Sequence, residues 1–87
     1  MTIPKNITRA HILDAMATID DDGVPRAFQS RVIDLLHDGK RYPPKYVIAI
    51  ANWEANGEQL GPEEFRTSQA QRFLMKMGFT VVPKKKL

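Results

Sequence analysis

The chain has 87 residues, of which 43% are hydrophobic and 26% charged, a balance typical of one globular domain rather than of a disordered segment. Its formal net charge is +3, and the three lysines at 84–86 account for all of it, so the net charge by itself does not indicate a nucleic-acid partner. The chain has no cysteine, no signal-peptide pattern and no apolar run near the ~18 residues of a membrane span, which excludes disulfide bonds and predicts a cytoplasmic protein without membrane contact.

The first predicted element is a helix that begins at Thr8. Thr8 is a preferred N-cap residue, and Ile7 is spaced to pack against Ile12 across that cap. Apolar residues then recur at helical spacing, and three aspartates followed by glycine predict an end near Asp20, because acidic charge opposes the negative end of the helix dipole. The residues that support this prediction are Ile12, Leu13, Met16, Ile19 and the run 20–23.

A β-hairpin is predicted next. Residues 28–37 contain a dense apolar run, and Asp38 and Gly39 form the dipeptide that best fits a tight hairpin turn. The second strand is predicted from Lys40 to Tyr42, because Pro43 and Pro44 cannot donate to a ladder.

Two further helices and a last strand complete the prediction. Pro44 suits the first turn of a helix that ends at Asn56 and Gly57, and Leu60 and Phe65 are expected to fill the core from the following loop. Thr67 or Ser68 is predicted to cap the last helix, whose apolar face contains Ala70, Phe73, Leu74 and Met77, and residues 79–82 are predicted as a strand.

The predicted fold class is therefore α+β, with element order α-β-β-α-α-β and a three-stranded, mainly antiparallel sheet packed against helices. Residues 1–83 are expected to form one module, and residues 84–87 a basic solvated tail.

The first candidate binding site is the basic cluster of Lys40, Arg41 and Lys45. Two of these residues end a hairpin and the third begins a helix, so all three are expected to project near a helix N-terminus, which favours a phosphate. The flanking Tyr42 and Tyr46 either stack on a base or cover the core. The alternative is that the basic side chains are ordinary solvated turn residues.

The second candidate site is the start of the last helix. Arg66, Thr67, Ser68, Gln69 and Arg72 combine guanidinium, hydroxyl and amide groups of the kind that contact phosphates, and glutamine can also recognise adenine. The alternative is an ordinary capped helix with a polar outer face.

Neither a metal site nor an active site is predicted. His11 and His37 are isolated in the sequence, and no nucleophile elbow, phosphate-binding glycine loop or HNH-like histidine arrangement is present. We expect no cofactor and no catalysis.

The segments GKRYPPKYVIAIA, ANGEQLGPEEF and FLMKMGFTVV resemble the N-terminal head domain of ScoMcrA-like type IV restriction endonucleases. The resemblance spans nearly the whole chain and includes TRAHILDAM and the GVP after the first helix. In such endonucleases an HNH part cuts DNA, separate domains recognise methylated or phosphorothioated DNA, and the head domain is accessory. The resemblance thus implies a DNA-associated module without a catalytic centre. Relatives often have a glycine-rich loop before the last helix, where this chain has RTSQ.

The leading hypothesis is a non-catalytic module that binds the phosphate backbone of DNA through both candidate sites, beside a nuclease partner or a fused nuclease domain. The alternative is a protein-interaction adaptor that recruits a nuclease through Trp53, Tyr46 and a sheet edge. A third hypothesis is a small enzyme whose catalytic residues meet only in three dimensions.

Overall fold

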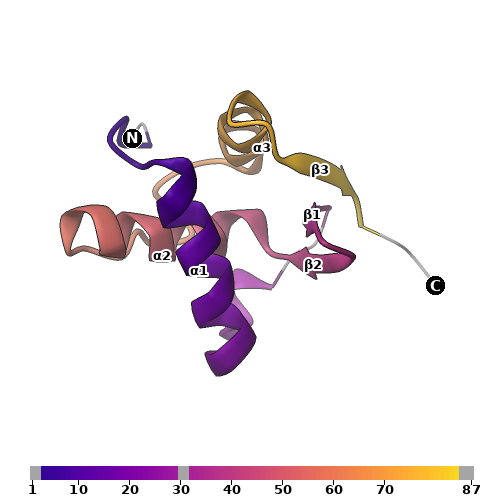
Figure 1. The fold of residues 1–87 in the computed structure, drawn as a ribbon, viewed down its shortest axis with the longest axis horizontal. Coiled ribbons are helices and arrows are strands. Elements are labelled where there is room, and N and C mark those ends of the chain that lie inside the picture. Colours follow the sequence, from indigo (N-terminus) through magenta and orange to yellow (C-terminus); the bar gives the residue numbers. More distant parts are fainter. Residues whose placement is uncertain (1–2, 30–31, 85–87) are drawn as a thin grey trace.

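A computed structural model of the chain describes residues 3–29 and 32–84. Within them lie three α-helices, a short 3₁₀-helix and three strands (Figure 1). The predicted α+β class and the order α-β-β-α-α-β are confirmed. The elements are α1 (Arg9–Asp22), η1 (Arg26–Phe28), β1 (Ile33–His37), β2 (Lys40–Tyr42), α2 (Pro44–Asn56), α3 (Thr67–Lys76) and β3 (Thr80–Pro83).

Helix α1 begins as predicted, with Thr8 as its N-cap. The Thr8 hydroxyl accepts from the His11 N–H at 3.4 Å, and His11 Nδ1 accepts from the Thr8 N–H at 3.0 Å, so each residue satisfies a backbone donor of the other. The helix extends two residues beyond its predicted end at Asp20. It stops where Gly23, at φ 78°, donates its N–H to the Ile19 carbonyl.

The hairpin forms around Asp38 and Gly39, both at positive φ (50° and 78°), as a two-residue turn of type I′ requires. Strand β1 is shorter than predicted, because Arg26–Phe28 forms a 3₁₀ turn after Pro25. Phe28 is buried with its ring centre 4.9 Å from that of Tyr46, so a contact distant in sequence decides the conformation at this position. Ser30 and Arg31, which the prediction placed in the strand, lie outside the described residues.

Strand β1 is the middle of the sheet, whose order is β2-β1-β3 with both pairings antiparallel. Strand β3 begins at Thr80, one residue later than predicted, because the Phe79 N–H donates back to the Leu74 carbonyl of α3 at 3.1 Å. The Lys84 N–H donates to the Val32 carbonyl at 2.9 Å, so backbone pairing continues into the first residue of the predicted tail. The rest of that tail lies outside the described residues.

Helix α2 is the centre of the fold and lies against α1, α3 and β1. It begins at Pro44 and ends at Asn56, and Gly57 caps it as predicted, with φ 78° and its N–H donating to the Trp53 carbonyl. Leu60 and Phe65 fill the core from the following loop, which confirms that prediction. The largest fully buried side chains come from all the main layers: Ile12, Leu35, Val47, Ile48 and Leu74.

Helix α3 is not capped as predicted. Its N-cap is Arg66, and Thr67 and Ser68 lie in the first helical turn. The Gln69 side chain folds back and accepts from the Arg66 N–H at 2.8 Å, which replaces the predicted hydroxyl cap. The other end of α3 is bound to α1, because Arg9 donates to the Met77 carbonyl at 2.7 Å and its guanidinium lies 4.3 Å from the centre of the Phe79 ring.

Candidate nucleic-acid interface

The first candidate site does not assemble as one cluster. Lys40 and Arg41 are successive residues of β2, and successive side chains of a strand point to opposite faces of the sheet. Lys40 Nζ lies 3.5 Å from a carboxylate oxygen of Asp20, on α1. Arg41 Nη1 lies 3.2 Å from the carboxylate of Asp34 and 3.3 Å from the Pro83 carbonyl. The prediction that these cations project together with Lys45 is therefore wrong.

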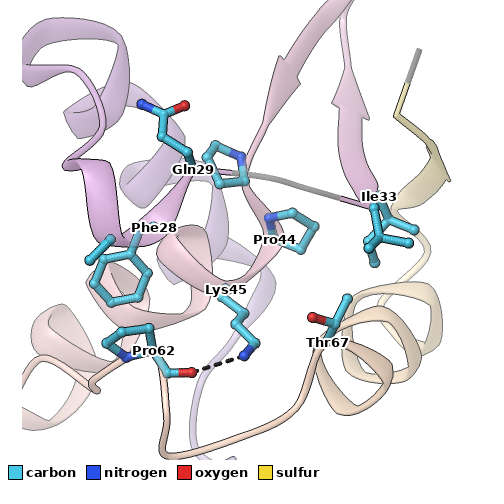
Figure 2. A pocket seen from close by; sticks show the side chains of 10 residues that line it. Phe28, Gln29, Ile33, Pro44, Lys45, Pro62 and Thr67 are labelled. Atoms are coloured by element: carbon cyan, nitrogen blue, oxygen red, sulfur yellow. Dashed lines mark hydrogen bonds between the residues drawn. The ribbon is translucent and has the colours of Figure 1, made fainter. Parts of the chain in front are cut away.

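Lys45 lies apart from both Lys40 and Arg41, beside the loop that precedes α3. Its Nζ donates to the Pro62 carbonyl at 2.9 Å and lies 5.7 Å from the centre of the Phe65 ring. Figure 2 shows this hydrogen bond at the side of a cavity of about 240 Å³. Thr67 lines the same cavity, so the structure brings one residue of each candidate site together here. The remaining lining is largely apolar: Ala27, Phe28, Val32, Ile33, Pro43, Pro44 and Pro62, with Gln29.

The surroundings of Lys40 are acidic. Asp20, Asp21 and Asp22 occupy the last turn of α1, where the helix dipole adds negative potential. Asp38 lies in the hairpin turn and lines, with Asp20 and Lys40, a hollow between α1 and the hairpin. A phosphate approaching Lys40 therefore meets more negative than positive charge.

Both tyrosines of the first candidate site belong to the core. Tyr42 is 5% exposed, and its hydroxyl donates to both carboxylate oxygens of Asp20. Burial, followed by this hydrogen bond, raises the pKa of the Tyr42 phenol above its ordinary value. Tyr46 is 8% exposed and packs against Phe28. The predictions of base stacking by Tyr42 and partner binding by Tyr46 are corrected accordingly, because both rings are buried.

The second candidate site is accessible. Arg66, Thr67, Ser68 and Arg72 are exposed, and Gln69 is half-buried because its amide oxygen caps the helix. In the described part of the chain, neither arginine forms an ion pair. These guanidinium groups thus keep their full capacity to bind an anion.

Three residues that sequence reasoning missed extend this surface along α3. Gln71, Met75 and Lys76 line one shallow hollow together with Ser68 and Arg72. Positions 68, 71, 72, 75 and 76 follow the helical period, on the side opposite buried Ala70 and Leu74. The same periodicity that indicated the apolar face therefore contained the signal for the polar one. Helix α3 contains no acidic residue.

Trp53, the other residue of the protein-interaction hypothesis, lies near the end of α2 and is 55% exposed. Residues 3–29 and 32–84 contain no group of three or more histidine or carboxylate side chains that could hold a metal ion. None of the helices in these ranges has the length and hydropathy needed to cross a membrane.

A family model described as "ScoMcrA-like, N-terminal head domain" matches residues 5–83, which confirms the resemblance drawn from the GKRYPPK segment and its flanks. No curated protein and no solved structure matches the chain.

Proposed function

The chain belongs to the ScoMcrA-like N-terminal head-domain family, and from this premise we propose that it is a DNA-binding accessory module of a restriction system, without a catalytic centre of its own. The match is to a head domain and not to an HNH catalytic domain. Restriction-type nucleases act on DNA. DNA is therefore the expected partner of an accessory domain that has an exposed basic surface.

The observation that carries the proposal is the charge on the outer side of α3. Arg66, Arg72 and Lys76 are exposed, form no ion pair with any described residue and stand on a helix without acidic side chains. The first N–H groups of α3 lie beside the Arg66 and Thr67 side chains and add donors of the kind that bind phosphate. The surface is therefore suited to the backbone of a nucleic acid.

Lys40 and Arg41 have a secondary part in this proposal. A phosphate can use Lys40 only by replacing Asp20, and Arg41 only by leaving the buried carboxylate of Asp34 without its cation. An uncompensated buried charge is costly, so we assign Arg41 to the fold. Lys45 contacts DNA in this proposal only if it releases the Pro62 carbonyl.

A salt titration of duplex DNA binding tests the proposal. We expect the double variant Arg66→Ala/Arg72→Ala to bind more weakly, with the slope of log K against log salt reduced by about 0.9 for each phosphate that the variant no longer neutralises. The matched control, Lys5→Ala/Arg26→Ala, removes the same charge from exposed positions on other parts of the fold and should retain the slope. Absence of binding at low salt, or the same weakening in both double variants, would contradict DNA binding through α3.

The exposure of Trp53 favours a second candidate function, a protein-interaction adaptor that recruits a nuclease. Such an association would rest on apolar contact and would change little with salt. Capture of the HNH nuclease part by the immobilised domain tests it, with Trp53→Ala as the variant and the exposed Met75→Ala as the control. Equal capture by wild type and Trp53→Ala would exclude the tryptophan as the anchor.

A further inference from the structure

Resting on the proposed DNA-binding function, we propose that α3 enters the major groove of duplex DNA with the side formed by Ser68, Gln71, Arg72, Met75 and Lys76, and that Gln71 and Met75 contact base edges there. These five residues are called the outer face of α3 below. The inference assigns base recognition to residues outside both predicted sites.

The outer face stands clear of the rest of the described fold. Helix α3 packs its opposite side on α2, and its C-terminal end approaches β3. Figure 1 shows the helix at the periphery of the molecule, with no other element over its outward side. Its ten residues correspond to roughly 15 Å of helix, and the major groove, about 12 Å wide, admits a helix of this kind.

The charged side chains of this face lie together along one of its margins. Arg72 and Lys76 are one helical turn apart, and no described carboxylate pairs with either. The acidic residues nearest in sequence, Glu63 and Glu64, precede the helix, and the Glu64 carboxylate accepts from the Gly61 N–H. Arg72 and Lys76 can therefore contact phosphates along one side of a groove.

The other margin of the face, formed by Gln71 and Met75, carries groups that distinguish bases. Gln71 is half-buried, and no other described residue forms a hydrogen bond with its carboxamide, which can pair with the N6 and N7 edge of adenine. Met75 is 54% exposed, although the helix has a separate buried face, so packing within the domain does not explain its position. An exposed apolar side chain can contact the C5-methyl group of thymine in the major groove. Gln71 and Met75 are one helical turn apart, so an amide contact and an apolar contact to bases can be made together. This pair favours recognition of bases over binding to the phosphate backbone alone.

Two experiments on the whole protein test this proposal. Selection from a pool of random duplexes should enrich a preferred sequence, and binding should protect guanine N7, which lies in the major groove, from methylation. We expect Gln71→Ala to lower the ratio of preferred to scrambled affinity by roughly 10-fold while scrambled DNA is bound as before. Gln59→Ala, in an exposed loop, is the control. Circular dichroism verifies that each variant retains its helices.

The outcomes separate this inference from the proposed function. Binding without an enriched sequence and without protection of N7 overturns major-groove readout and leaves the phosphate-binding module in place. Binding to single-stranded nucleic acid or to an acidic protein in preference to duplex DNA also overturns it. Absence of nucleic-acid binding at low salt removes both proposals together.

Discussion

The hydroxyl of Tyr42 donates to both carboxylate oxygens of Asp20, at 3.0 and 3.1 Å, and joins the end of the hairpin to the last turn of α1. Asp20 also accepts from Lys40 at 3.5 Å, so one carboxylate engages two residues of the segment that looked like a phosphate site. The GKRYPPK segment is thus largely committed to holding the fold.

We expect Tyr42→Phe to lower the free energy of unfolding by about 1–2 kcal/mol, because the variant removes a hydrogen bond to a charged group and leaves a carboxylate without its phenol. Lys40→Ala, which removes the exposed partner of the same carboxylate, should cost less than about 0.5 kcal/mol. Urea denaturation at neutral pH measures both. Equal decreases would contradict the larger contribution assigned to the phenol.

The same hydrogen bond predicts a pH dependence at the alkaline side. Because the folded state raises the pKa of Tyr42, the contribution of this group is complete below its ordinary pKa of 10.0 and is lost as the pH rises through the folded-state value. Stability of the wild type should therefore decline above about pH 10 more steeply than that of Tyr42→Phe. Denaturation at a series of pH values checks this, and parallel curves would contradict it.

Replacement of Glu54 is expected to stabilise the fold. Its Oε2 is buried without a hydrogen-bond partner in the described part of the chain, and burial, followed by the charge of Asp14, raises its pKa, while His11 acts in the opposite direction. The raised pKa means that ionised Glu54 opposes folding, so stability due to this group is lost as the pH rises above its ordinary value of 4.5.

Glu54→Gln should accordingly raise the melting temperature at pH 7, and the gain should vanish in acid, where Glu54 is protonated. Glu58→Gln, at an exposed position, serves as the control and should leave the melting temperature nearly unchanged. A decrease in stability of Glu54→Gln at pH 7 would indicate that the carboxylate has a favourable partner.

Arg9 joins the start of α1 to the end of α3, through the Met77 carbonyl and the face of the Phe79 ring. We expect Arg9→Ala to destabilise by about 1–2 kcal/mol, because the substitution removes a charge-assisted hydrogen bond and a cation–π interaction. Arg26→Ala, an exposed arginine of η1, should change stability by less than about 0.5 kcal/mol. Thermal unfolding followed by circular dichroism measures the difference.

Asn52 is buried and organises the end of α2. Its amide donates to the Glu58 carbonyl at 2.7 Å and its oxygen accepts from Asn56, which exchanges hydrogen bonds with Asn6. Asn52→Ala should cost about 2–3 kcal/mol, because buried partners are left without their hydrogen bonds, whereas Asn6→Ala, at the exposed end of the network, should cost less than about 1 kcal/mol. Equal costs in chemical denaturation would contradict this order.

Elements set by local stereochemistry were predictable. Asp38 and Gly39 adopt positive φ in a two-residue turn, Pro44 begins α2 and Gly57 ends it, because each of these residues restricts or permits its own backbone angles. The predicted secondary structure was wrong where a contact between residues distant in sequence decides the backbone conformation. The strand expected from residue 28 is replaced there by a turn, since Phe28 packs on Tyr46.

The candidate site likewise has a part that the sequence predicted and a part that only the fold reveals. Spacing along residues 67–76 was sufficient to identify the apolar side of α3, and the outer face of α3 follows from the same period, although only Ser68 and Arg72 of that face were predicted. The sequence by itself determined the family, the element order and the supply of basic residues. Only the tertiary structure decided which basic side chains already have a partner, because Lys40, Arg41 and Lys45 come next to Asp20, Asp34 and Pro62 only when the chain folds.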